Sequence, residues 1–191
     1  MTSEPRIVSR STTRISPWVE LIARLVDFGR GAAPETYNAI NRADYVGIWA
    51  MTPDGRSAVV GQYRPAVERH TWEFPAGMVD GAEDAAATCV RELKEETGLL
   101  ARRVHASGTY APDTARLSNA FHAFFVETEE PAGNSRPEQG MAVELVDFPK
   151  LCSLIVRGEF VLQSHIGLIT LALLSPSVSS VLPARLVIPS D

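Results

Sequence analysis

A stretch of 23 residues, 77–99, constrains this chain more than any other part of its sequence. It starts with glycine-rich sequence, follows a helical pattern from about Glu83, and ends at Gly98, which suits the left-handed position just past a helix end. Apolar residues recur in it at steps of three and four, so we expect one face of the helix to pack against a core. These residues are Ala86, Ala87, Val90 and Leu93.

Three glutamates gather on the same predicted helix. Glu95 and Glu96 follow Glu92 by three and four residues, so the three carboxylates are neighbours on the helix surface. Like charges at this spacing repel and destabilise an isolated helix. Their retention indicates a divalent cation between them, because hard cations such as magnesium prefer carboxylate oxygens and bridge to substrate phosphates.

The stretch resembles the Nudix box, Gly-x5-Glu-x7-Arg-Glu-U-x-Glu-Glu-x-Gly-U, where U is an aliphatic residue. It matches at every fixed position, namely Gly77, Glu83, Arg91, Glu92, Leu93, Glu95, Glu96, Gly98 and Leu99. A solvated acidic helix face, the ordinary interpretation of a charge run, does not require this full pattern. The resemblance implies hydrolysis of a nucleoside diphosphate linked to another moiety.

The resemblance also implies which residues hold the cation, magnesium or manganese. Glu92 and Glu96 are expected as the main side-chain ligands, with Glu95 as a further ligand or a support, so all three are candidate catalytic residues. In relatives the backbone carbonyl of the residue before the box glycine, here Ala76, also contacts metal.

Four further box residues have expected structural roles. Gly77 lets the loop pass close to the cation because it has no side chain. Arg91 is expected to tie this loop to the helix through ion pairs with acidic box residues, as its planar fork suits carboxylates. Glu83 is expected as a structural residue with it, and Gly98 as the end of the helix.

Beyond the box, the chain resembles the ADP-ribose and nucleoside-diphosphate-sugar pyrophosphatase branch from about residue 17 to residue 174. The segments that carry this resemblance are Gln-Tyr-Arg-Pro at 62–65, Trp-Glu-Phe-Pro-Ala-Gly at 72–77, Leu-Ser-Asn at 117–119 and the strands before residue 45. In that branch the N-terminal strands commonly cross to a partner subunit. The resemblance therefore implies a homodimer that releases a nucleoside monophosphate and a sugar phosphate from ADP-ribose or a related nucleotide sugar.

Three residues are candidates for substrate binding. Trp18 stacks on a nucleobase or is an ordinary core or interface tryptophan. Arg64 contacts the diphosphate or the terminal ribose, since arginine suits bidentate phosphate contacts, or forms a surface ion pair. Glu73 holds a metal or a substrate hydroxyl, or pairs with Arg64.

Two positions depart from the branch pattern. In the ADP-ribose branch a proline lies about fifteen residues beyond the box. Here the nearest proline, Pro112, stands thirteen residues past Leu99, so this marker is shifted. The position of the loop glutamate that serves as catalytic base in several relatives falls on Met141. We expect Glu138, in a loop that closes over the site, in preference to Glu144, which lies in a strand pattern; a box carboxylate is the remaining alternative.

Other functions stay open. Within the enzyme class the alternative is a GDP-mannose-preferring or broad nucleotide-sugar hydrolase. Coenzyme A and diadenosine polyphosphates fit less well, because Leu117 stands where the diadenosine group has a tyrosine. The alternative of another class is a non-catalytic Nudix module that senses a nucleotide, but such modules usually lose box carboxylates.

The hydrophobic pattern predicts an α+β protein, an α/β/α sandwich, with an N-terminal antiparallel strand block. We expect residues 1–14 to be flexible, strands at 17–28, 35–41, 45–51, 57–63, 72–74, 104–110, 120–127 and 143–148, and helices at 149–157 and 163–174. The expected domains are a dimerising block (1–44), a catalytic domain (45–175) and a tail (176–191).

Composition limits the partners. A net charge of −5 gives no basic footprint for nucleic acid, and no apolar run is long enough to span a bilayer. The N-terminal sequence lacks the apolar core of a signal peptide. Cys89 and Cys152, the only cysteines, form no metal or redox pattern, so we expect a soluble cytoplasmic protein.

Overall fold

A computed structural model describes residues 4–131 and 140–182 of the chain. The chain divides into two compact units. The first consists of Met1–Asp44 and Ala111–Ala120, and the second of Tyr45–Tyr110 and Phe121–Asp191.

The first unit is built on a three-stranded antiparallel sheet in the order β1-β2-β3. Its strands are β1 (Arg6–Ser16), β2 (Val19–Asp27) and β3 (Glu35–Asn41). The expectation that residues 1–14 are flexible is therefore wrong for β1. Its side chains are almost all exposed, so the strand forms through pairing with β2, as at Thr12 opposite Ile22, and not through burial.

The segment 111–120 is held against β3. The Tyr37 hydroxyl donates to the Ala115 carbonyl at 2.7 Å, and the Ile40 amide donates to the Arg116 carbonyl at 2.7 Å. The Arg116 guanidinium lies 4.9 Å from the centre of the Tyr37 ring. These contacts explain why a segment from the middle of the sequence belongs to the N-terminal unit.

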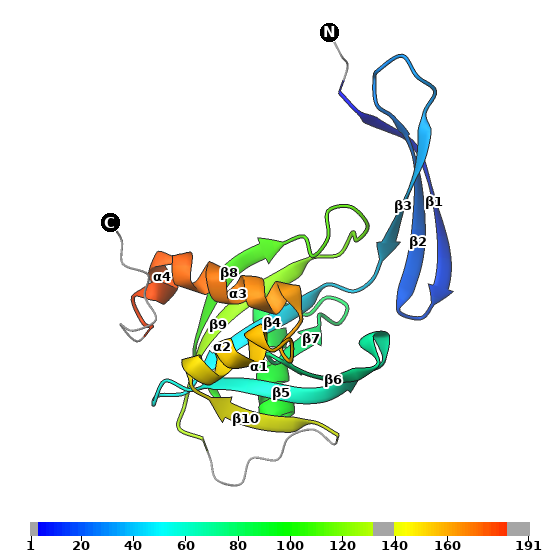
Figure 1. Cartoon of the computed structure of the whole chain (residues 1–191). Coiled ribbons are helices and arrows are strands. Elements are labelled where there is room, and N and C mark those ends of the chain that lie inside the picture. The colour runs from blue at the N-terminus through cyan, green and yellow to red at the C-terminus, as the bar shows by residue number, and fades with distance from the viewer. Residues whose placement is uncertain (1–3, 132–139, 183–191) are drawn as a thin grey trace. The chain divides into compact units, whose positions relative to one another are not determined.

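The second unit contains a mixed seven-stranded sheet in the order β10-β5-β4-β9-β8, with β6 paired to β5 and β7 paired to β4 (Figure 1). Its strands are β4 (Tyr45–Met51), β5 (Ser57–Arg64), β6 (Arg69–Glu73), β7 (Ala76–Met78), β8 (Ala101–Tyr110), β9 (Phe121–Thr128) and β10 (Ala142–Val146). A short 3-10 turn, Pro65–Val67, connects β5 to β6. The central strands β4 and β9 are parallel, and β4 is buried almost throughout, as its apolar sequence predicts.

Helices cover both faces of this sheet (Figure 1). On one face α1 (Ala85–Thr97) packs Cys89 and Leu93 against Val46 and Ile48 of β4. On the other face, Trp49 belongs to the core formed with α2 (Phe148–Val156), α3 (Gln163–Leu174) and α4 (Pro176–Ser179). The predicted α/β/α sandwich and N-terminal strand block are confirmed.

The helix that carries the box begins two residues after the predicted start. Asp84 caps it by accepting a hydrogen bond from the Ala86 amide at 3.0 Å, and Gly98 ends it with a φ of 71°. The strand β7 was not predicted, because three residues that include a glycine give no periodic signal. None of the helices in the two described segments is long and apolar enough to cross a membrane.

Candidate active site

The candidate site lies where β7 meets α1. Pairing with β4 fixes the β7 backbone, with Val46 opposite Gly77 and Gly47 opposite Ala76. A Cβ atom on Gly77 would overlap the carboxyl group of Glu92, so the backbone of β7 passes directly against this carboxylate. The box glycine is thus required by a close approach of the loop to the helix.

Glu96 holds the same backbone from one helical turn further along. Its side chain is buried, and its Oε2 accepts the Ala76 amide hydrogen at 2.9 Å. Glu92 is partly buried, and this burial raises the pKa of its carboxyl group against the opposing effect of Arg91. Two carboxylates therefore face the Ala76–Gly77 segment.

Arg91 connects the helix to the loop that precedes it. Its guanidinium lies 2.7 Å from a carboxylate oxygen of Glu92, 3.0 Å from Glu83 and 3.1 Å from Glu95. The fork hydrogen-bonds Glu83, and this contact raises the pKa of Arg91 and lowers that of Glu83. Glu95 is more than half exposed and lies on the outer side of the cluster. These contacts have the form expected for a structural arginine in the box.

A second charged cluster lies on the same face of the sheet. Arg64 on β5 pairs with Glu73 on β6, with Nη2 2.5 Å from Oε2 and Nε 3.0 Å from Oε1. Burial acts to raise the pKa of Glu73, but the hydrogen bonds from Arg64 and Thr71 outweigh it and leave the pKa lowered. The charge of Glu96 helps to raise the pKa of Arg64, so the two clusters interact electrostatically.

The oxygen donors present suit a hard divalent cation. Glu92, Glu96 and the Ala76 carbonyl supply only oxygen, the element that magnesium and manganese prefer. Among the residues that the structure describes, no group of three or more histidine, cysteine or acidic side chains is close enough to hold an ion alone. Magnesium is commonly bound by one or two carboxylates together with water and substrate phosphates.

Two predicted site residues do not belong to the described part of the second unit. Trp18 belongs to the first unit, in the turn between β1 and β2, and is 67% exposed. Glu138 lies outside the described residues. Its alternative, Glu144 on β10, pairs with Val59 on β5. Val59 belongs to the core on the face of the sheet that α2 and α3 cover. Cross-strand partners share a face, so Glu144 points away from the box helix.

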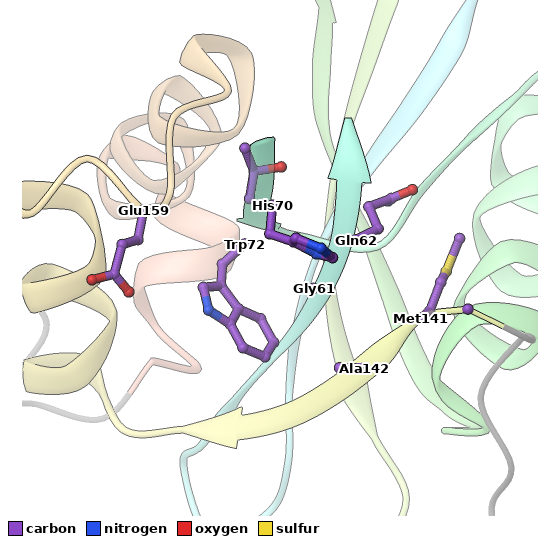
Figure 2. Close-up of a pocket in the computed structure, with 9 residues that line it drawn as sticks. Gly61, Gln62, His70, Trp72, Met141, Ala142 and Glu159 are labelled. Carbon is purple, nitrogen blue, oxygen red and sulfur yellow. The ribbon is translucent and has the colours of Figure 1, made fainter. Parts of the chain in front are cut away.

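A pocket of about 440 Å³ lies next to the Arg64–Glu73 pair and is lined by residues of β5, β6 and the start of β10. Figure 2 shows Gln62 and Trp72 on opposite sides of β5, with Met141 beyond Gln62 and Glu159 beyond Trp72. The Trp72 ring covers Gly61, where an added Cβ would lie 2.9 Å from it. Gln62 therefore shares the face of the Arg64–Glu73 pair, while Trp72 faces the helices α2 and α3.

Two residues that contact the site region have no sequence signal of function. The Thr71 hydroxyl donates to Glu73 at 2.8 Å. His165 on α3 is fully buried, and its Nδ1 accepts the Phe74 amide hydrogen at 3.1 Å, between Glu73 and the β7 backbone. The His165 contact joins residues 91 positions apart, so residue spacing does not indicate it. Thr71 is near Glu73 in sequence, but a threonine in a strand is ordinary and gives no signal of function.

Comparisons with known proteins agree with this geometry. The chain is similar to an ADP-ribose pyrophosphatase of Bacillus subtilis, 28% identical over 109 residues that cover 57% of this chain and 58% of the relative. It is 32% identical to an ADP-sugar pyrophosphatase of Mus musculus over 97 residues, 48% of this chain and 44% of the relative. The chain spans about half the length of the curated relatives it matches.

A solved structure shows the same fold. The crystal structure of an ADP compounds hydrolase superposes with a TM-score of 0.74 at 17% identity, over 90% of this chain and 93% of that chain. The NUDIX domain matches residues 41–159, more than half of the chain, and includes β4, the box helix and both charged clusters. The chain therefore belongs to the Nudix domain family.

Proposed function

We propose that this chain is a divalent-metal-dependent hydrolase of the diphosphate in ADP-ribose or a related nucleoside diphosphate sugar. Its products are a nucleoside monophosphate and a sugar phosphate. One observation carries the proposal: Glu92 and Glu96 are both held against the Ala76–Gly77 backbone, at a glycine that has no side chain to obstruct a cation. The two pyrophosphatase relatives support the substrate class.

The chemistry follows from the charge of the substrate. A diphosphate resists hydrolysis because its oxygens repel an incoming hydroxide, and a bound divalent cation neutralises them and lowers the pKa of water. Glu92, Glu96 and the Ala76 carbonyl would hold this cation, magnesium in the first place and manganese in the second. Arg91 keeps the Glu92 carboxylate in place through its 2.7 Å contact, with Glu95 as a support.

Arg64 is the proposed contact of the diphosphate or the adjacent ribose. Its side chain is 42% exposed while Glu73 is almost fully buried, so the pair presents the arginine and not the acid. An exposed guanidinium on the carboxylate face of the sheet suits an anionic substrate. Glu73 therefore orients Arg64, and Trp18 is the proposed stacking partner of the nucleobase.

The catalytic base is proposed as Glu138, since Glu144 points to the other face of the sheet. Replacing Glu138 by Gln should lower kcat strongly and leave the affinity for metal unchanged. Equal loss in Glu144→Gln and no loss in Glu138→Gln would reverse this choice. No loss in either variant would assign the base to a box carboxylate.

We propose a homodimer assembled through residues 1–44, with 45–175 as the catalytic domain and 176–191 as a tail. Seven large apolar side chains of the first unit are exposed, and exposed apolar side chains of this kind support an interaction surface. They are Ile7, Val8, Ile15, Trp18, Leu21, Tyr37 and Ile40. Sedimentation of the full chain should give a dimer, and a monomer would contradict the assignment.

A cytoplasmic location remains a prediction from the two free cysteines, Cys89 and Cys152.

A phosphatase-coupled assay tests the function. The panel is ADP-ribose, ADP-glucose, UDP-glucose, GDP-mannose and diadenosine polyphosphates, each with magnesium, with manganese and with chelator. Preference for ADP-ribose, with AMP and ribose 5-phosphate as products, would support the proposal. Similar rates on all sugars would indicate a broad nucleotide-sugar hydrolase. Binding of a nucleotide sugar without turnover would support the sensing module instead.

A further inference from the structure

The segment Arg69–Glu73 of β6 places a buried threonine beside the arginine–glutamate pair. Thr71 and Glu73 are two residues apart on a strand, so their side chains share one face of the sheet. The register of β6 with β5 pairs Thr71 with Gln62 and Arg69 with Arg64, which puts Arg64 on that face as well. This is the face that α1 covers.

The hydrogen bonds of Glu73 are shared between the two neighbours. Its Oε1 accepts from the Thr71 hydroxyl at 2.8 Å and from Arg64 Nε at 3.0 Å, while its Oε2 accepts from Arg64 Nη2. Glu73 is 3% exposed and Thr71 is 2% exposed, so water does not compete for these bonds. Thr71 thus fixes the plane of the carboxylate, and the carboxylate fixes the plane of the guanidinium.

Arg64 has hydrogen-bonding capacity beyond this pair. In the described part of the chain its Nη1 has no hydrogen-bond partner, and its side chain is 42% exposed. A guanidinium held on one edge by a carboxylate presents its other edge in a fixed direction. An arginine held in this way loses less rotamer freedom when it binds a phosphate.

We propose that Thr71 is a positioning residue that acts through Glu73 to aim Arg64 at the substrate diphosphate or its adjacent sugar. This inference rests on the proposed function for its kinetic consequence. Thr71 does not touch substrate itself, because its hydroxyl is buried and donated to Glu73.

The kinetic test replaces only the hydroxyl. Thr71→Val should raise KM for the best nucleotide sugar about 10-fold with kcat within about 2-fold, because Arg64 binds ground state and transition state alike. Thr71→Ser keeps the hydroxyl and should restore the wild-type KM. Thr128→Val is the matched control: Thr128 is equally buried, and its hydroxyl donates to the Glu129 carbonyl, away from the site. It should leave KM unchanged.

A double-mutant cycle separates positioning from a structural role. In an Arg64→Ala background, Thr71→Val should no longer raise KM, because its effect is carried by Arg64. An equal increase of KM in both backgrounds would overturn the inference, as would a Thr71→Ser variant that behaves like Thr71→Val.

An NMR measurement tests the inference without turnover, so that it can fail separately from the proposed function. The Arg64 Nε–H signal should exchange slowly with water in the wild type and in Thr71→Ser. In Thr71→Val the exchange should be at least about 10-fold faster, because the carboxylate that accepts this hydrogen is no longer fixed. Unchanged exchange in Thr71→Val would overturn the inference even if the chain hydrolyses nucleotide sugars. Absence of turnover with the expected exchange would reject the proposed function alone.

Discussion

Gly77 and Glu92 occupy adjoining space: a Cβ on Gly77 would overlap the Glu92 carboxyl group. The group that must yield is the far end of a flexible side chain, and not backbone. Gly77→Ala should therefore fold and displace this carboxylate. We expect kcat to fall about 100-fold, since a misplacement of about 1 Å at a reacting centre has this effect. Steady-state kinetics with magnesium and a thermal melt measure the two consequences.

The control for this substitution is Gly167→Ala. Gly167 lies inside α3, and an added Cβ would meet no atom within 4 Å. Alanine there should leave kcat unchanged and stabilise the helix slightly. Equal kcat in Gly77→Ala and the wild type would show that the position of the Glu92 carboxylate does not matter for turnover.

Glu96→Gln separates the charge of Glu96 from its hydrogen bond. The amide oxygen still accepts the Ala76 amide hydrogen, so the loop should stay in place. The negative charge that attracts a cation is lost, and kcat should fall at least about 100-fold with weaker apparent magnesium affinity. Magnesium titration of activity measures both effects. Glu129→Gln makes the same chemical change at an exposed residue and should be silent; unchanged turnover in Glu96→Gln would reject the metal assignment.

Arg91→Lys tests whether the fork, and not only the charge, is needed. A guanidinium reaches Glu83, Glu92 and Glu95 together, whereas one ammonium group does not span them. We expect kcat to fall about 10-fold and the melting temperature to decrease, because the loop is no longer tied to the helix. Arg157→Lys, in an exposed pair with Glu159, is the matched control and should change neither. Full activity in Arg91→Lys would show that a single positive charge is sufficient.

The box illustrates what sequence reveals about this fold. Glu92 and Glu96 are one helical turn apart, so local spacing alone places them on one side of α1. The contact of Arg91 with the acidic box residues is likewise nearly local. Tertiary pairing decides the remainder. The polar sequence of β1 becomes a strand because β2 pairs with it. Its hydrophobic pattern has no periodicity that predicts this pairing.

The same distinction explains the second charged cluster. The pairing of Arg64 with Glu73 was one of two alternatives from sequence, because it depends on the register of β5 and β6. Thr71 gave no signal, since a threonine in a strand is ordinary. The role of His165 depends on the contact of α3 with Phe74, between residues 91 positions apart in the sequence.

His165 should make folding stability sensitive to mild acid. It is fully buried, which lowers its pKa to about 4, with the charge of Glu73 opposing and that of Arg64 assisting this decrease. Above pH 6.5, the ordinary pKa of histidine, it is neutral in both states and full stability is present. Between pH 6.5 and about pH 4, His165 takes up a proton in the unfolded chain but not in the folded chain. Stability should therefore fall by about 1.4 kcal/mol per pH unit in this window.

His165→Asn provides the measurement, because an amide oxygen can accept the Phe74 amide hydrogen but does not titrate. Urea unfolding at pH 7.5 and 5.0 should show a loss of stability about 2 kcal/mol smaller in this variant than in the wild type. Subtracting the loss of stability in the variant from that in the wild type cancels the contribution of the carboxyl groups, which are the same in both proteins. An identical loss in His165→Asn and the wild type would show that His165 is protonated in the folded chain, and that its contact with Phe74 has to be reassigned.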